Sequence, residues 1–203
     1  PRALETMYNR SGKDIRRLQS EVEKLVGYLG TRKQITVEDV ERLFGDFHEA
    51  AFYEFNTAVR SADLGRCLVA LHENLRIVDH PLQTLASLAN EIRKLMVARE
   101  LLFTVFQPHW KRGMSYNRFK QVVETVREEN PHMMEKGRFN LLTNKEYPIY
   151  LALKDSQKFS MERLIGIMQA IHEVDVMFKS SRIGSVSPAS LMEGLVMKIC
   201  RPG

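Results

Sequence analysis

The sequence has little of what defines several protein classes. Its two cysteines, Cys67 and Cys200, are too few for a disulfide framework or a four-ligand zinc site, and predict reduced thiols of an intracellular protein. No apolar run reaches the ~18 uninterrupted residues that a membrane span needs. The first residues, from Pro1 onward, include neither an initiator Met nor an apolar signal-peptide core. We therefore expect a cytoplasmic chain, without a membrane span, that begins inside a longer protein.

Motifs for catalysis and for cofactors are also missing. Three His-Glu dipeptides begin at positions 48, 72 and 172, but the second histidine of a zinc-protease helix is replaced by Phe52, Arg76 and Val176. Gly12-Lys13 resembles the end of a phosphate-binding loop, yet Met7 stands at the first glycine position. We expect no catalytic residue, no cofactor and no metal, and these absences favour a binding role.

Positive charge is modest in total and uneven along the chain. The formal net charge is +5 over 203 residues. Between positions 107 and 145 four acidic residues accompany eight basic ones: Lys111, Arg112, Arg118, Lys120, Arg127, Lys136, Arg138 and Lys145. From position 179 onward Glu193 is the one acid beside Lys179, Arg182, Lys198 and Arg201. Such clustering permits contact with a polyanion, and solvated helix faces are the alternative.

Almost every segment has the apolar spacing of an amphipathic helix. One stripe runs through Ile15, Leu18, Val22, Leu25 and Leu29 and stops at Gly30, a good residue for a helix end. Further helices are predicted to begin at Thr36, from its capping-box spacing to Asp39, and at Asp63, Pro81, Ser115 and Ser160, which are residues suited to a cap or a first helical position. We predict an all-α chain of eight to ten helices.

Three apolar stripes locate the predicted core. The long helix after Pro81 carries Leu82, Leu85, Ala89, Ile92, Met96, Arg99 and Phe103 on one side. Leu71 and Ile171 lie at the centres of two other stripes and are predicted to be core residues. The best internal boundary is Phe44-Gly45-Asp46, between a small N-terminal helical piece and a larger bundle.

The order of several short patterns resembles one protein family. EVEKLVGYLG at 21–30 and ITVEDVERL at 35–43 are similar to the end of the small helical lid domain of the bacterial DNA polymerase III delta subunit. DLGRCLVAL at 63–71, with Pro81-Leu82 and IRKL at 92–95, looks like the start of that family's collar domain. FSMERL at 159–164 and DVMFKS at 175–180 look like its closing helices.

This resemblance implies an architecture and a role. Residues 1–46 would be the C-terminal part of the lid domain, and residues 47–203 the helical collar, with a basic insertion near 107–146 in place of a short linker. The chain would then be the C-terminal part of a clamp-loader subunit and would carry no nucleotidyl-transfer chemistry. Its collar would join other loader subunits in a ring around primer-template DNA. Contact with the sliding clamp would be made only through an N-terminal domain that precedes the chain.

Six residues are candidates for these contacts. Lys111, Arg112, Arg118, Lys179 and Arg182 are the expected DNA-binding residues, although Lys179 and Asp175 also have the spacing of a helical ion pair. Arg93 lies beside an apolar stripe, where it either extends along the core edge or pairs across a subunit interface.

A different class of function stays open. The chain could instead be an unrelated helical nucleic-acid-binding module that uses the basic segment 107–145. Trp110 and Tyr116 flank Lys111 and Arg112, a mixture suited to stacking on single-stranded bases, although packing is the favoured role for Trp110.

Overall fold

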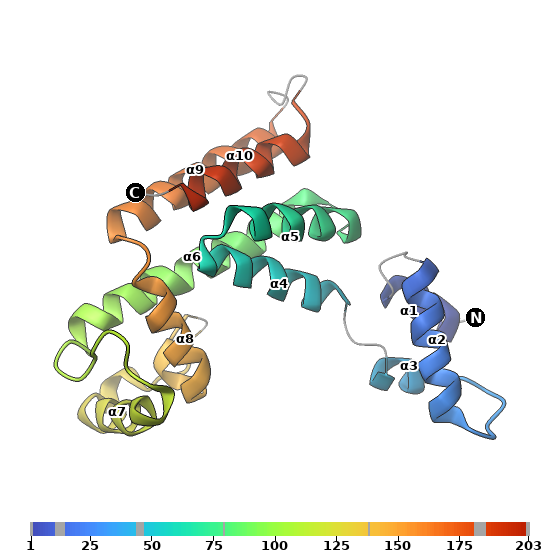
Figure 1. Ribbon diagram of the computed structural model, residues 1–203, viewed down its shortest axis with the longest axis horizontal. Helices are drawn as coiled ribbons and strands as arrows, with labels where there is room; N and C mark the ends of the chain where they lie inside the picture. The colour runs from blue at the N-terminus through green and yellow to red at the C-terminus, as the bar shows by residue number, and fades with distance from the viewer. Residues whose placement is uncertain are drawn as a thin grey trace.

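The computed structural model describes residues 2–10, 15–43, 47–78, 80–137, 139–180 and 186–201. These ranges contain ten α-helices, two short 3-10 helices and no strand (Figure 1). The predicted all-α class and the predicted number of helices are confirmed.

The first three helices build a small core of their own. They are α1 (Arg2–Arg10), α2 (Ile15–Leu29) and α3 (Val37–Leu43), and Figure 1 shows them as a separate group at the N-terminal end. Their buried side chains are Met7, Leu25, Leu29 and Val40. The predicted boundary at 44–46 falls outside the described residues, so the division into residues 1–46 and 47–203 stays a prediction.

Local signals at α2 and α3 behave as the sequence predicts, with one exception. Gly30 follows the last residue of α2 with a φ of 55°, a left-handed conformation that glycine adopts without strain. Thr36 Oγ1 accepts the Asp39 N–H at 3.2 Å, and the Asp39 carboxylate accepts the Thr36 N–H at 3.1 Å, which completes a capping box. Ile15 is 81% exposed, contrary to expectation, because the core forms around the later turns of α2.

Five helices form the largest core of the described chain, called here the first core. These are α4 (Phe47–Ser61), α5 (Leu64–Ile77), the first half of α6 (Pro81–Thr104), α9 (Met161–Lys179) and α10 (Pro188–Cys200). Leu71 and Ile171 are both buried in it, as predicted. The helix starts are also confirmed: the side chains of Asp63, Ser115 and Ser160 each accept a backbone N–H from three residues ahead.

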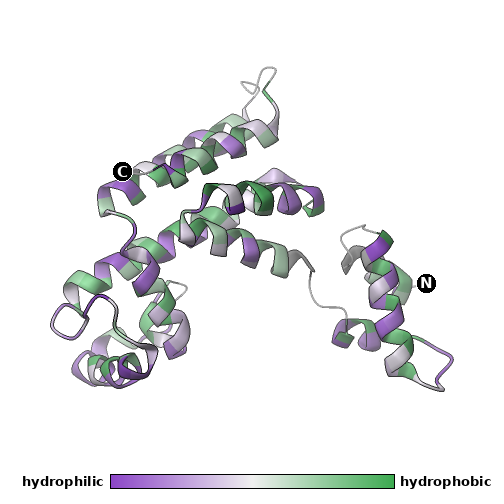
Figure 2. Cartoon of the chain, in the orientation of Figure 1, coloured by the Kyte–Doolittle hydropathy of each residue, from purple (hydrophilic) through white to green (hydrophobic). Residues whose placement is uncertain are grey.

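The basic insertion is part of a second core rather than a free loop. It contains α7 (Tyr116–Glu129) and two 3-10 helices, η1 (Pro131–Met133) and η2 (Leu141–Thr143), and is followed by α8 (Glu146–Ser156). Phe106, Phe119, Val123, Leu142 and Ile149 are buried there against the second half of α6. Figure 2 shows α7 as mostly hydrophilic, whereas α10 is largely hydrophobic.

The long helix α6 serves both cores, and this corrects the predicted stripe. Leu85 and Ile92 are buried against the first core as expected, but Phe103 is 59% exposed. In its second half α6 instead buries Ala98, Leu101 and Leu102 in the second core, where it contacts α8 and η2. The buried side of the helix therefore shifts along its length, and a single 3.6-residue stripe does not describe it.

An ion-pair cluster lies where the two cores meet. The Arg60 guanidinium of α4 is 2.8 Å from Glu91 Oε1 of α6 and 3.5 Å from Asp155 Oδ2 of α8. The Glu91 side chain is only 5% exposed, and the side chains of Arg60 and Asp155 are each 15% exposed. Lys158 Nζ bonds Asp155 at 2.9 Å and the Arg60 carbonyl at 3.0 Å. Three helices are thus joined through one guanidinium.

Shortening a core side chain tests the first core. We expect Leu71→Ala or Ile171→Ala to lower the free energy of unfolding by about 2–4 kcal/mol, because each leaves a cavity in packed surroundings. Val69→Ala, on the same helix as Leu71 but 68% exposed, is the control and should change little. Urea unfolding followed by circular dichroism measures the effect. Equal stability of Leu71→Ala and Val69→Ala would contradict the packing of α5.

Removing the central guanidinium tests the ion-pair cluster. Arg60→Met should cost about 3 kcal/mol or more in urea unfolding, because Lys94 is then the one ion-pair partner of the buried Glu91 carboxylate among the described residues. The double variant Arg60→Met/Glu91→Leu should recover much of this loss, since the buried carboxylate of Glu91 is removed together with its partner. If the double variant were no more stable than Arg60→Met, the loss would come from packing rather than from the buried charge.

Candidate nucleic-acid and assembly surfaces

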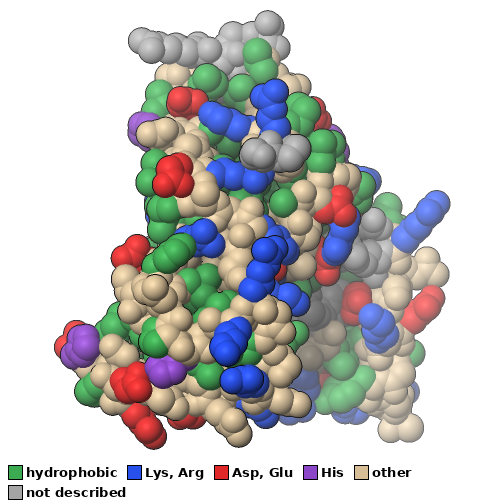
Figure 3. Space-filling view, turned by 60° about the vertical axis from the view of Figure 1, so that its left-hand side comes forward, with side chains coloured by type: hydrophobic (Ala, Val, Ile, Leu, Met, Phe, Trp, Pro, Cys, Tyr) green, Lys and Arg blue, Asp and Glu red, His purple; other side chains and the backbone are tan. Residues whose placement is uncertain are grey.

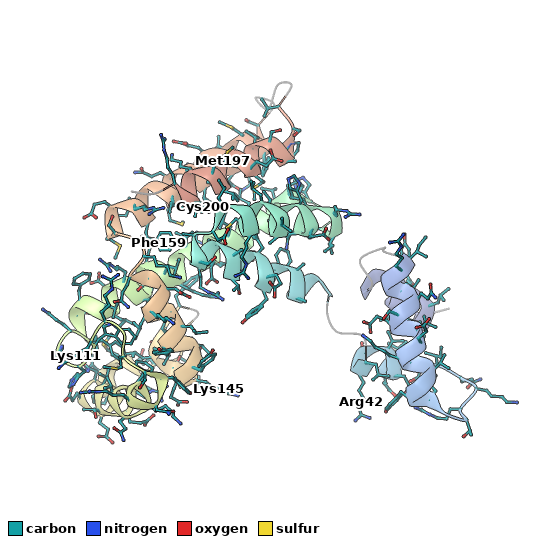
Figure 4. All side chains as sticks on the ribbon, in the orientation of Figure 1. Arg42, Lys111, Lys145, Phe159, Met197 and Cys200 are labelled. Carbon is teal, nitrogen blue, oxygen red and sulfur yellow. The ribbon has the colours of Figure 1, made fainter. Side chains whose placement is uncertain are left out.

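Three of the predicted DNA-binding residues lie close together in sequence at the α7 end of the molecule. Lys111 and Arg112 are exposed in the turns after α6, and Arg118 is exposed in the first turn of α7. The Ser115 hydroxyl fixes this turn by accepting the Arg118 N–H at 3.4 Å. None of the three cations pairs with a described carboxylate. Figure 4 labels Lys111 and Lys145 at this end of the chain.

Arg127, another basic residue of the same segment, has a structural role. Its guanidinium bonds Glu124 Oε1 at 2.9 Å, Glu146 Oε1 at 3.2 Å and the Asn144 carbonyl at 2.5 Å. The pKa of the Glu146 carboxyl is lowered from its ordinary value by a hydrogen bond from the Glu146 backbone N–H and by one from the Arg127 side chain. Arg127 therefore joins α7 to the start of α8, and its charge is compensated inside the protein.

The neighbouring aromatic rings pack against other side chains of the protein. Trp110 meets Phe119 edge to face at a centroid distance of 5.7 Å, and Tyr116 meets Tyr147 in the same way at 5.2 Å. Both rings contact the second core. The favoured packing role of Trp110 is confirmed.

The remaining DNA-binding candidates are far from this group. Lys179 is the last residue of α9, and its ammonium bonds Asp175 Oδ2 at 2.7 Å, the ion pair that the spacing predicts. Arg182 lies outside the described residues. In Figure 1 the end of α9 and α7 are at opposite ends of the larger helical part. Among the described residues, Lys179 therefore does not form one continuous site with Lys111, Arg112 and Arg118.

Arg93 and Lys179 instead line the same groove. It runs between α6 and α9, has a volume of about 450 Å³, and is bordered by apolar residues such as Leu82, Ala89 and Met168. Arg93 is exposed at its edge and donates to Asn90 Oδ1 at 3.3 Å. The sequence suggested separate roles for Arg93 and Lys179, whereas the helix packing places them on one surface.

Sequence reasoning missed a second hollow, where α9 begins and α10 ends. It has a volume of about 620 Å³ and is lined by Lys158, Ser160, Arg163, Gly166, Ile167, Lys198 and Arg201. Figure 4 labels Phe159 and Cys200 near these two helix ends. Lys198 and Arg201 were counted only within a basic C-terminal window, because their neighbours Lys158 and Arg163 come much earlier in the chain.

The two cysteines meet at the last residue of α10. Cys200 Sγ is 3.5 Å from Cys67 Sγ, and both are free thiols, as expected. The hydrogen bond and the burial of the side chain raise the pKa of Cys67. The same hydrogen bond and the nearby Arg163 guanidinium lower the pKa of Cys200. This contact joins α5 to the last turn of α10.

Within the described ranges, neither a metal-binding cluster nor a membrane-spanning helix is found. No cluster of three or more His, Cys, Asp or Glu side chains is arranged to hold a metal ion. No helix of these ranges combines the length and apolar character that crossing a membrane requires.

These helices and surfaces define an all-α protein with two adjoining cores and a small N-terminal helical group. Among solved structures, the chain is similar to the Bacillus subtilis DNA clamp loader delta protein (YqeN), with a TM-score of 0.52 and 16% sequence identity. The similarity covers 98% of this chain and 50% of that protein, so the chain spans half of its length. No protein-family model matches the sequence, and no curated protein matches it.

At this identity the similarity establishes the fold. The expected resemblance to a clamp-loader delta subunit is confirmed at that level, and it extends over nearly the whole chain.

Proposed function

We propose that the chain is the C-terminal part of a delta-type subunit of a DNA polymerase III clamp loader. Residues 1–46 are the end of its lid domain and residues 47–203 its collar. The observation that carries this proposal is the match in fold over 98% of the chain, which includes the N-terminal helices as well as both cores. The order of the sequence patterns at 21–43, 63–95 and 159–180 supports it independently.

The proposed role is mechanical. The collar binds other loader subunits and holds them around primer-template DNA in the cytoplasm, while a sliding clamp is placed on that DNA. The chain itself is not catalytic and uses no cofactor. This part of the proposal is supported by the missing phosphate-binding loop and the missing zinc-protease spacing.

The groove between α6 and α9 is the best candidate for the contact with a neighbouring subunit. It is lined by apolar residues together with the charged residues Arg93, Asp175 and Lys179, a mixture that suits the apolar centre and polar rim of protein interfaces. Apolar side chains continue along α9, where Ile165 is 44% and Val176 43% exposed. A helix from another collar is the proposed occupant, because helix packing requires an apolar strip of this kind.

Assembly is the first test. The isolated chain should be a monomer or associate weakly in analytical ultracentrifugation, and should form a complex when mixed with the other clamp-loader subunits of its source. Arg93→Glu should weaken this complex about tenfold or more, because it reverses the charge at the groove edge. Lys33→Glu, an exposed change of the same charge in the turn after α2, should have no effect.

A tight homopentamer of the isolated chain would contradict the delta assignment. Equal weakening by Arg93→Glu and Lys33→Glu would remove the groove from the interface and leave only a general effect of charge.

We also propose that Lys111, Arg112 and Arg118 contact DNA in the assembled loader, together with Lys179 and Arg182. The support is strongest for the first three, because they are exposed and have no described carboxylate partner. Lys179 must give up its bond to Asp175 in order to bind a phosphate.

A salt series tests these contacts. Each real phosphate contact on a single strand contributes about 0.7 to the slope of log affinity against log salt, since binding releases counterions. The triple variant Lys111→Ala/Arg112→Ala/Arg118→Ala should therefore lower the slope for primer-template DNA by about 2. Lys179→Ala/Arg182→Ala is measured in the same way. A set of residues whose removal leaves both slope and affinity unchanged does not contact the DNA.

The alternative function is a helical nucleic-acid-binding module that uses residues 107–145. The unpaired cations after α6 favour it. This alternative expects salt-sensitive DNA binding by the isolated chain and no complex with loader subunits, so the assembly experiment separates the two.

A further inference from the structure

The hollow between the start of α9 and the end of α10, here called the basic pocket, is unusual in its charge. Four of its seven lining residues are cationic and none is acidic: Lys158, Arg163, Lys198 and Arg201 stand beside Ser160, Gly166 and Ile167. Figure 3 shows Lys and Arg side chains gathered in a band along the face that includes this end of the molecule. Low-dielectric walls lined by one sign of charge concentrate counter-ions.

Two of the cations are held in place by the protein. The Arg163 guanidinium donates to the Ile199 carbonyl at 2.7 Å and to the Arg201 carbonyl, and lies over the Phe159 ring. Lys158 is held by Asp155 and by the Arg60 carbonyl, as described above. Both residues are therefore fixed in position, and since Lys158 is paired with Asp155, Arg163 is the one of the two that has no described carboxylate partner.

The other two cations have no ion-pair partner among the described residues. Lys198 and Arg201 are exposed at the end of α10. A helix C-terminus favours nearby cations, but Arg163 already bonds two carbonyls there. The nearest acidic neighbour along α9 is Glu162, whose pKa is lowered by hydrogen bonds from its own backbone N–H and from Ser160. Its carboxylate therefore serves the start of α9 and does not line the pocket.

We propose that the basic pocket binds the phosphate groups of a nucleic-acid strand. Its volume lies in the range of about 300–1,000 Å³ that accommodates a ligand well beyond the size of a single phosphate. The four cations come from both helix ends, and the other lining residues, Ser160, Gly166 and Ile167, carry no charge. Lys198 lies in the last turn of α10 and Arg201 directly follows the helix, so two exposed cations three residues apart are available to the phosphates of one strand.

This site is distinct from the described residues of the DNA contacts proposed above, which lie after α6, in the first turn of α7 and at the C-terminal end of α9. The inference deepens the proposed function, and rests on it only in the choice of DNA as the probe. It would place a second contact with the strand on the face that carries the ends of α9 and α10.

The test uses the whole chain and a fluorescein-labelled single-stranded oligothymidylate. Binding is followed by fluorescence anisotropy over a chloride series. Lys198→Ala/Arg201→Ala should bind about tenfold more weakly at low salt, and the salt slope should fall by about 1.4, or about 0.7 for each lost contact. Thermal unfolding confirms that the variant is folded, and Arg163 is left unchanged because it also bonds the end of α10.

The matched control is Lys33→Ala/Arg66→Ala, which removes the same charge from two exposed positions, Lys33 in the loop after α2 and Arg66 on α5. It should keep the wild-type slope. Equal losses in the two double variants would overturn the proposal, because they would reflect net charge alone. Absence of binding by the wild-type chain at low salt would overturn it as well.

Two further arms separate the remaining possibilities. Inorganic phosphate added at constant ionic strength should not displace the oligonucleotide; displacement would mean that a small free anion is the ligand and would overturn the strand proposal. The Lys198→Ala/Arg201→Ala variant should still enter the complex with loader subunits. If the chain forms no such complex but the slope still falls in this variant, the clamp-loader function is wrong and the basic pocket stands.

Discussion

The ion pairs of the Arg60 guanidinium are the interactions on which the arrangement of helices α4 to α10 depends. The guanidinium lies between two carboxylates, one on α6 and one on α8, at the level where the first core ends and the second begins. Burying these charges is unfavourable unless all of them are paired. The pairing therefore fixes the positions of α4, α6 and α8 more narrowly than apolar packing does, because apolar contacts have no preferred direction.

Lys158 connects this cluster to the outer surface. It is bonded to the cluster through Asp155 and the Arg60 carbonyl, and it also lines the basic pocket. Arg163 has a comparable double position, since it bonds the end of α10 and lines the same pocket. The two cations that are most restrained in the pocket are thus those that also hold the fold together. A change at either one would disturb structure and charge at once.

The sequence allowed much of the fold to be predicted and less of the candidate sites. Caps at Asp63, Ser115 and Ser160, and the helix end at Gly30, depend on residues close in sequence and were predicted correctly. Phe103 was placed on the wrong side because the buried face of α6 depends on which helices cover its second half. That information is contained in α7 and α8 and not in α6 itself.

The same limit applies to the surfaces. The groove beside Arg93 requires α6 and α9 to lie together, and the basic pocket requires the start of α9 to meet the end of α10. Counting charges in windows of sequence placed Lys198 with Lys179, although the two line different hollows. Conversely, Arg127 was counted as part of a basic segment and is neutralised by Glu124 and Glu146.

The length of α6 has a mechanical consequence. Its 24 residues make a rod of about 36 Å that is embedded in one core at each end. A rod held in this way acts as a lever: a tilt of about 10° at one end displaces the other by about 6 Å over that length. A small rotation of α6 on the α9 side of the first core therefore produces a larger displacement at α7 and at the exposed cations beside it.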